Sequence, residues 1–230
     1  MYSNSLFLVI FALILSCNST KQKADKIHSE NFKYLALGDS YTIGESVCNS
    51  CNFPNQLSTE LENKGIKNSN VNIIARIGWT TTQLINAISN SKLDPNYDIV
   101  TLLIGVNNEY QNLDFNIYKK EFPVLLNKAI ELANNNSNKV IVLSIPDYAY
   151  TPFGQSINNN SNISKAIDNY NTYAASVCKL KGVSFLNITD ITRLGLENPK
   201  LVAKDGLHPS KEAYTKFVKR LLPLTLSKIN

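Results

Sequence analysis

The sequence predicts an α/β fold in which a central sheet of five parallel strands lies between two layers of helices, a three-layer α/β/α sandwich. Five short apolar runs alternate with segments whose apolar residues recur at helical spacing, and this alternation is typical of βαβ units. The 230 residues are 43% hydrophobic and 18% charged, which suits one globular domain with a sizeable core. The sequence contains no internal repeat and no sign of a second domain.

The strands and helices are expected in alternation after residue 32. Each expected strand is a short run of mainly apolar residues bounded by polar ones, and these runs are 34–37, 71–75, 99–104, 140–145 and 184–186. Each expected helix carries apolar residues three or four positions apart, and these segments are 54–64, 80–89, 116–134, 164–181 and 210–222. The asparagine-rich stretches at 134–136 and 158–160 are expected in loops and turns.

The N-terminal segment has the pattern of a targeting sequence. Residues 6–15 form an apolar run that is too short to span a bilayer, and it ends in Ile-Leu-Ser-Cys at Cys17, which resembles a bacterial lipobox. We therefore expect a lipoprotein signal peptide at 1–17, lipidation of Cys17, a polar tether at 18–31 and the folded domain at 32–230. Such a protein would be anchored to a membrane in the bacterial cell envelope, facing the periplasm or the cell surface. The alternatives are an uncleaved anchor or a plain secretory signal, since residues 1–5 lack Lys and Arg.

The charge pattern and the missing motifs exclude several classes of function. The net charge is +5, but the lysines are scattered without a basic stripe, so nucleic-acid binding is not expected. The sequence has no Gly-x-Gly-x-x-Gly, no P-loop and no Gly-x-Ser-x-Gly elbow. We expect no cofactor and no metal.

Chemically useful residues follow several of the expected strands at the point where each strand ends. Ser40 follows the first strand, Gly78 the second and Asn107 the third, while Asp205 and His208 come after the fifth. In open α/β sheets, binding and catalytic residues gather beyond the carboxyl ends of the strands. We therefore expect these residues to meet at one edge of the sheet.

Ser40 and His208 have the residue types of a nucleophile and its base. A serine hydroxyl is a poor nucleophile until a base takes its proton, and that base needs a partner to fix its tautomer. The chain has only two histidines, and His28 lies in the polar leader, so His208 is the credible base. Asp205 precedes His208 by three residues, which lets its carboxylate accept a hydrogen bond from the imidazole.

This set of motifs resembles the SGNH (GDSL-type) hydrolase family, and the resemblance covers nearly all of the chain after residue 32. It implies a flavodoxin-like SGNH fold and an esterase that forms an acyl-enzyme on Ser40, with Asp205 and His208 completing a catalytic triad. It also implies an oxyanion hole formed by the Ser40 amide, the Gly78 amide and the Asn107 side chain. One departure is Asn108, where the family usually has aspartate. Substrates of the family are lysophospholipids, thioesters, simple esters and carbohydrate O-acetyl groups.

Each motif also has a reading without catalysis. Gly78 alone is typical of a turn, Asn107 of a helix cap, and Asp205 and His208 of N-terminal capping or half a metal site. Two other functions stay open: a catalytically inactive, lipid-anchored protein that binds glycans or lipids on the same fold, and a metal-dependent hydrolase. The order of the motifs and their positions at strand ends favour the esterase.

Two segments are expected to border the site. Cys48 and Cys51 lie in the loop after Ser40, where they could form a disulfide in an oxidising envelope or stay reduced. The segment 145–154 follows the fourth strand and is a candidate substrate-binding wall. The residues that could contact the ester substrate, or could equally pack in the core, are Trp79, Tyr148, Tyr150 and Phe153.

Overall fold

A computed structural model describes residues 32–67, 69–157 and 160–229 of the chain. Its five strands form one parallel sheet in the order β2-β1-β3-β4-β5, so the first strand lies inside the sheet and the chain winds outward to both edges. The predicted α/β fold is thereby confirmed. The expected signal peptide, tether and lipidation site at Cys17 lie outside the described residues.

Each strand of the sheet is short; the three inner strands are buried almost throughout, whereas the two edge strands are partly exposed. The strand bounds are β1 (Lys33–Gly38), β2 (Asn70–Ala75), β3 (Ile99–Leu103), β4 (Val140–Leu143) and β5 (Ser184–Leu186). The register pairs Leu37 of β1 with Leu102 of β3. Adjacent strands therefore present their apolar side chains in line.

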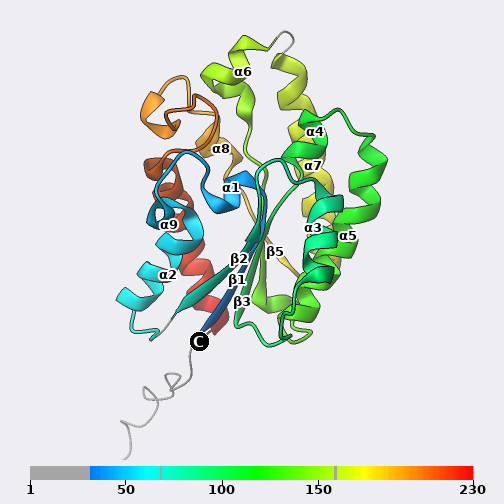
Figure 1. Cartoon of the computed structure of the whole chain (residues 1–230), viewed down its shortest axis with the longest axis vertical. Helices are drawn as coiled ribbons and strands as arrows, with labels where there is room; N and C mark the ends of the chain where they lie inside the picture. The colour runs from blue at the N-terminus through cyan, green and yellow to red at the C-terminus, as the bar shows by residue number, and fades with distance from the viewer. Residues whose placement is uncertain (1–31, 68, 158–159, 230) are drawn as a thin grey trace, which may run out of the picture.

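Helices cover both faces of the sheet (Figure 1). On one face lie α2 (Phe53–Asn63) and α9 (Lys211–Ile229), which pack against each other, with α8 (Thr189–Thr192) beside them. On the other lie α3 (Thr81–Asn90), α5 (Phe115–Leu132) and α7 (Asn160–Lys181). The remaining short elements are α1 (Ser40–Ile43), α4 (Val106–Tyr110), α6 (Pro152–Ser156) and the 3₁₀ turns η1 (Asn49–Cys51), η2 (Ser137–Lys139), η3 (Tyr148–Tyr150) and η4 (Pro199–Leu201).

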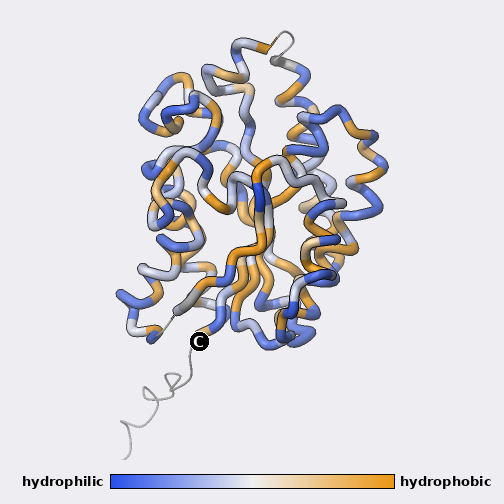
Figure 2. Tube along the Cα trace, viewed as in Figure 1, coloured by the Kyte–Doolittle hydropathy of each residue, from blue (hydrophilic) through white to orange (hydrophobic). Residues whose placement is uncertain are grey.

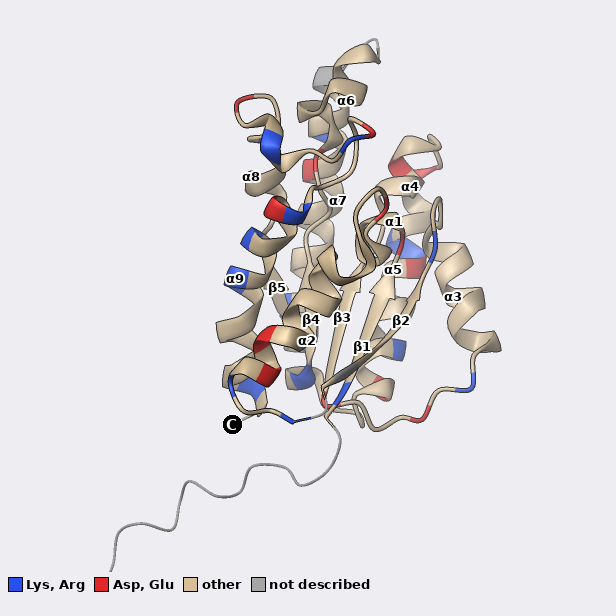
Figure 3. Cartoon of the chain, turned by 60° about the vertical axis from the view of Figure 1, so that its left-hand side comes forward, with Lys and Arg blue, Asp and Glu red and all other residues tan. Residues whose placement is uncertain are grey.

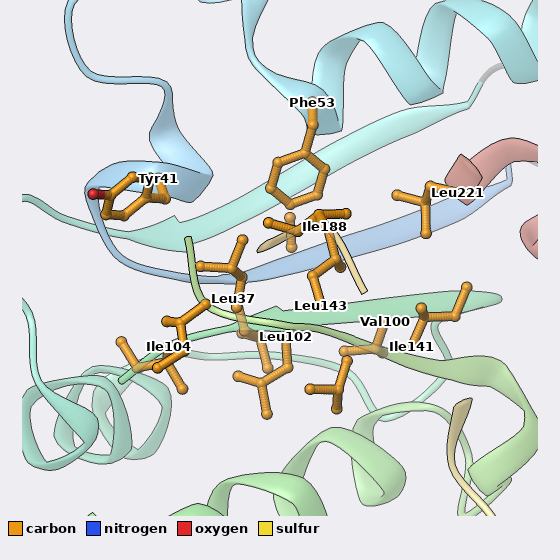
Figure 4. Packing of buried hydrophobic residues seen from close by; sticks show 14 of the residues in the cluster. Leu37, Tyr41, Phe53, Val100, Leu102, Ile104, Ile141, Leu143, Ile188 and Leu221 are labelled. Atoms are coloured by element: carbon orange, nitrogen blue, oxygen red, sulfur yellow. The ribbon is translucent and has the colours of Figure 1, made fainter. Parts of the chain in front are cut away.

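The core forms where the helices bury their apolar stripes on the strands. Figure 4 shows Leu37, Leu102 and Leu143 on three neighbouring strands, with Phe53 of α2 and Leu221 of α9 approaching from the helices. All five side chains are at most 2% exposed. Burial of each such side chain contributes about 1.5–3 kcal/mol. The strands accordingly carry the strongest hydrophobic colour of the chain, while the helices alternate (Figure 2).

The last helix extends beyond its expected end. The sequence pattern predicts a helix that ends at Leu222, directly before Pro223, a residue that has no N–H to donate within a helix. In the structure α9 continues through Pro223 to Ile229. Thr225 in this last part is fully buried, and its hydroxyl donates to the Leu221 carbonyl at 2.9 Å. The helix therefore stays packed against the rest of the protein beyond the proline.

The described surface mixes both signs of charge. In Figure 3 lysine and arginine are interspersed with aspartate and glutamate rather than gathered in one stripe. Among the described residues, none of the helices combines the length and apolar character needed to cross a bilayer.

Candidate active site

The loops that follow the strands bring the sequence-predicted residues to one edge of the sheet. Ser40 begins α1 directly after β1, and Asn107 lies in α4 after β3. Asp205 and His208 lie in the segment between η4 and α9. This segment is held in place by an isolated bridge between Val202 and Pro209. The edge therefore collects side chains that are far apart in the sequence.

The turn from β1 into α1 fixes the position of Ser40. Asp39 is the N-cap of α1, and its side chain accepts a hydrogen bond from the Tyr41 backbone N–H at 3.0 Å. Gly38 leaves no room for a side chain, since a Cβ there would lie 2.1 Å from Thr42 Oγ1 and 2.4 Å from the Leu103 carbonyl oxygen. The strand thus turns sharply and aims Ser40 out of the sheet edge.

Asp39 is a fully buried carboxyl group beside Ser40. It is 0% exposed, and burial raises its pKa to about 8 despite the hydrogen bond from Tyr41. Its Oδ2 oxygen has no hydrogen-bond partner within the described part of the chain. A protonated Asp39 places no charge next to Ser40 at neutral pH.

Ser40, His208 and Asp205 form a continuous hydrogen-bonded chain. The Ser40 hydroxyl lies 3.0 Å from His208 Nε2, and His208 Nδ1 lies 2.6 Å from Asp205 Oδ2. Ser40 is 4% exposed and His208 is 7% exposed. The Tyr41 ring packs beside the imidazole, with ring centroids 5.2 Å apart. The ring nitrogen that faces Ser40 is therefore the one left free when Nδ1–H binds Asp205.

Asp205 is held as a carboxylate by several donors. The backbone N–H groups of Leu207 and His208 donate to Oδ1 at 2.9 and 3.0 Å, and the Ser46 hydroxyl donates to Oδ2 at 2.7 Å. Partial burial raises the pKa of this carboxyl, but the hydrogen bonds from Ser46, His208 and the backbone outweigh it and hold the pKa at about 2. Asp205 is thus an anion that can fix the imidazole and stabilise its protonated form.

The other two residues expected in the oxyanion hole lie in the loop before α3 and in helix α4. Gly78 has φ +76°, a backbone conformation that favours glycine, and it precedes α3. Asn107 Nδ2 donates to the Trp79 carbonyl at 3.0 Å, and Gln111 Nε2 donates to the Gly78 carbonyl at 3.1 Å. Since Nδ2 carries two hydrogens, this bond leaves the second for another acceptor. Helix α4 therefore holds the Gly78 loop from one side.

The aromatic residues expected to contact substrate differ in their exposure. Tyr148 is 5% exposed, and its hydroxyl donates to Glu109 Oε2 at 2.8 Å. Phe153 is half-buried, whereas Tyr110 is 50% exposed and packs on both rings at centroid distances of 6.0 and 6.1 Å. Tyr148 therefore supports the exposed Tyr110.

The other two expected contacts are half-buried. Trp79 and Tyr150 both pack against the core. The Arg193 guanidinium lies 6.0 Å from the centre of the Tyr150 ring. Trp79 adjoins Gly78, so of the two it lies nearer the oxyanion loop in sequence.

The loop after Ser40 contains a disulfide between Cys48 and Cys51, with the two Cα atoms 5.0 Å apart. Asn52 joins the ends of this loop: its Nδ2 donates to the Ile43 carbonyl at 2.9 Å and its Oδ1 accepts from the Asn55 N–H at 2.9 Å. Within the described residues, Cys178 forms no disulfide and lies buried in α7. In the three described ranges, no group of three or more His, Cys, Asp or Glu side chains is arranged to hold a metal ion.

Three residues at the site were not singled out from the sequence. Ser46 contacts Asp205, while Ile77 and Tyr110 are 57% and 50% exposed beside the oxyanion residues. Ile77 directly precedes Gly78, and Tyr110 lies three residues after Asn107. For Ile77 and Tyr110, the sequence signal that could have found them is their closeness to Gly78 and Asn107.

Comparison with known proteins identifies the family. A model of the GDSL-like Lipase/Acylhydrolase family matches residues 36–216, which include every motif of the site. The chain belongs to this family. It is therefore a hydrolase that acts on ester bonds. A search of curated proteins by sequence gives no match.

Solved structures share the fold of this GDSL-family chain at low sequence identity. TesA is 14% identical with a TM-score of 0.64, and the match covers 85% of this chain and 99% of that one. A lipase/acylhydrolase from Enterococcus faecalis is 18% identical with a TM-score of 0.62, covering 86% and 95%. A variant of Axe2, an acetyl xylan esterase from Geobacillus stearothermophilus, is 16% identical with a TM-score of 0.60, covering 84% and 94%.

Proposed function

We propose that this GDSL-family hydrolase is a serine esterase that forms an acyl-enzyme on Ser40. The observation that carries the proposal is the continuous chain from Ser40 through His208 to Asp205, with distances of 3.0 and 2.6 Å. A nucleophile, a base and an orienting carboxylate in this order are the parts that acyl transfer requires. The family match supports the same reaction class.

In the first half of the reaction, His208 Nε2 takes the Ser40 proton as Oγ attacks the ester carbonyl. Negative charge then develops on the carbonyl oxygen, where the Ser40 and Gly78 amides and the second Asn107 N–H would donate to it. Asp205 stays ionised and stabilises the protonated imidazole. His208 then gives its proton to the departing alcohol, which leaves an acyl group on Ser40.

In the second half, His208 takes a proton from water, and the resulting hydroxide attacks the acyl carbonyl. The tetrahedral intermediate collapses, His208 returns the proton to Ser40, and the carboxylic acid is released. Every proton passes through one imidazole nitrogen, so the reaction needs no further acid or base.

The decisive experiment compares Ser40→Ala with Ser50→Ala, an exposed serine in the following loop. Ester hydrolysis and covalent labelling by a fluorophosphonate should both disappear in Ser40→Ala and persist in Ser50→Ala. Turnover by a folded Ser40→Ala protein at the wild-type rate would show that the proposal is wrong.

The substrate we propose is a carboxylic ester whose alcohol or acyl part lies on the exposed surface of Ile77 and Tyr110, beside Trp79 and Phe153. Aromatic and aliphatic side chains of this kind bind apolar groups or the faces of sugar rings. A panel of simple esters of increasing acyl length, a thioester, an acetylated sugar and a lysophospholipid would identify the class. Ile77→Ser and Tyr110→Ser should raise KM for the preferred member. No change for any substrate would exclude this surface.

We also propose that the protein is attached to a membrane of the bacterial cell envelope through lipid on Cys17. The support is the lipobox-like sequence at the end of a short apolar run. Cys17→Ser should move the protein from the membrane fraction to the soluble fraction with unchanged specific activity. Wild-type protein that incorporates no labelled fatty acid in a bacterial host would contradict the proposal.

A further inference from the structure

Asn108 is a buried residue whose side-chain amide is bonded on both sides to Thr81. It is 0% exposed in α4, and Thr81 is the first residue of α3. Asn108 Oδ1 accepts from the Thr81 backbone N–H at 3.0 Å, and Nδ2 lies 2.7 Å from the Thr81 hydroxyl. Because a backbone N–H can only donate, it must face the amide oxygen. The amide orientation is therefore fixed, and Nδ2 donates to the hydroxyl.

The Thr81 hydroxyl also links Asn108 to helix α5. Since it accepts from Asn108, its own hydrogen is free to donate, and it does so to Glu121 Oε2. The Thr82 hydroxyl donates to the other oxygen of the same carboxylate at 2.8 Å. Helices α3 and α5 lie side by side at this point (Figure 1). The result is a one-way chain of hydrogen bonds from Asn108 through Thr81 to Glu121.

These hydrogen bonds reach both segments that carry the proposed oxyanion donors, helix α4 and the loop before α3. Asn108 adjoins Asn107, and Thr81 lies three residues after Gly78. Thr80, which lies between Gly78 and Thr81, is the N-cap of α3, and its backbone N–H donates to Gln83 Oε1 at 2.7 Å. A shift of the Asn108–Thr81 contact would therefore move the Gly78 loop relative to Asn107.

We propose that Asn108, Thr81 and Glu121 are positioning residues that set the geometry of the oxyanion hole. The inference rests on the proposed function, since it presumes that Gly78 and Asn107 bind the oxyanion. It also accounts for asparagine rather than aspartate at position 108. A carboxylate there would require the hydrogen of the Thr81 hydroxyl, which would leave two carboxylates facing one hydroxyl. Asn108 and Glu121 are thus a matched pair of donor and acceptor.

The test reverses the donor direction of the hydrogen bonds between Asn108, Thr81 and Glu121. Asn108→Asp keeps the shape but removes the donor, and kcat should fall about tenfold with little change in KM, because misplaced oxyanion donors act on the transition state. Adding Glu121→Gln to this variant should restore most of kcat. The new amide can donate to the Thr81 hydroxyl, which then donates to the new carboxylate. Glu121→Gln alone should be nearly silent, since the amide oxygen can still accept from Thr81.

Glu131→Gln is the matched control, because Glu131 is an exposed residue of the same helix. Combined with Asn108→Asp, it should restore nothing. Recovery by Glu121→Gln but not by Glu131→Gln supports the inference. A wild-type kcat in Asn108→Asp, or equal impairment of both double variants, overturns it.

Two further variants cover the case in which Asn108→Asp does not fold. Thr81→Val removes the central hydroxyl, whereas Thr82→Val removes an exposed hydroxyl that contacts Glu121 but not Asn108. Thr81→Val should lower kcat more than Thr82→Val, and equal values overturn the inference. All rates are expressed per fluorophosphonate-labelled site. If Ser40→Ala is active, the proposed function fails; if Ser40→Ala is inactive but Thr81→Val is not impaired, only this inference fails.

Discussion

The Ser46 hydroxyl lies 2.7 Å from Asp205 Oδ2, the same oxygen that lies 2.6 Å from His208 Nδ1. Ser46 is six residues after Ser40, so the loop that leaves Ser40 returns to the carboxylate that binds His208. Its φ of +65° is uncommon for a residue other than glycine. The loop thus holds a strained serine in contact with Asp205.

Loss of this hydroxyl should reduce catalysis while the overall fold is kept. Ser46→Ala is expected to lower kcat about three- to tenfold, the size expected for one hydrogen bond to a charged group at a partly exposed position. Ser46→Gly removes the same hydroxyl but relieves the backbone strain, so it should unfold at a higher temperature than Ser46→Ala while losing the same activity. Steady-state kinetics and thermal unfolding measure both effects.

Ser50→Ala is the control for these variants, since its hydroxyl faces Cys48 Sγ at 3.4 Å and not Asp205. It should keep the wild-type kcat. The prediction is wrong if Ser46→Gly has full activity.

The Cys48–Cys51 disulfide should stabilise the same loop. Closing so short a loop contributes at most about 2 kcal/mol to the free energy of unfolding in the chain-entropy model. Cys48→Ser combined with Cys51→Ser should therefore lower stability by about that amount and lower kcat in the same direction as Ser46→Ala, because Ser46 loses its support.

Reducing agent provides the check on the disulfide. It should destabilise the wild type and leave the double serine variant unchanged, since Cys178 is buried and forms no disulfide within the described residues. Equal sensitivity of the two proteins would mean that the disulfide does not account for the effect.

The sheet could be predicted from the sequence because buried strands appear in it as short runs of apolar residues. The runs at 34–37 and 184–186 match β1 and β5 within one residue, and all five long helices were expected, although several of their ends differ by two or more residues. The ends of helices are harder to predict, because they depend on caps and packing. Helix α9 continues past Pro223, and Asp39 caps α1, which at four residues is too short to show a helical period. Strand order then brings the motifs to one edge.

The supporting contacts could not be predicted in this way. Ser46 and Asp205 are 159 positions apart, and Thr81 and Glu121 are 40 apart. Each contact joins a common polar residue to a distant partner, and neither leaves a local pattern in the sequence. The same holds for the contact between Tyr110 and the ring of Tyr148, which is 5% exposed.

Asn107 of α4 and Gln111, the residue that follows α4, offer a sharp test of the oxyanion assignment. Both side chains donate to the backbone of the Gly78 loop, at 3.0 and 3.1 Å. Asn107→Ala should lower kcat about 10²–10³-fold with little change in KM, since it removes a donor to the developing charge. Gln111→Ala loses only a contact with the loop and should cost less than tenfold. Comparable losses in the two variants would mean that Asn107 acts through the loop and not on the oxyanion.

Asp39 should make the stability of the protein depend on pH. Its pKa is raised by burial from 3.8 to about 8, so between these values the folded state holds a proton that the unfolded state has released. The stabilisation from the protonated carboxyl is fully present below about pH 4 and is lost as pH rises toward 8. Across this window the free energy of unfolding of the wild type should fall, relative to Asp39→Asn, by up to about 1.4 kcal/mol per pH unit.

Urea unfolding of both proteins at several pH values measures this difference. Asn at position 39 can still accept from the Tyr41 N–H, so the cap of α1 is kept and only the titration is removed. Asp94→Asn, which changes an exposed aspartate, should follow the wild-type pH dependence. If the curves of wild type and Asp39→Asn run parallel from pH 4 to 8, the carboxyl is already ionised in the folded state. In that case the charge beside Ser40 would have to be included in the mechanism.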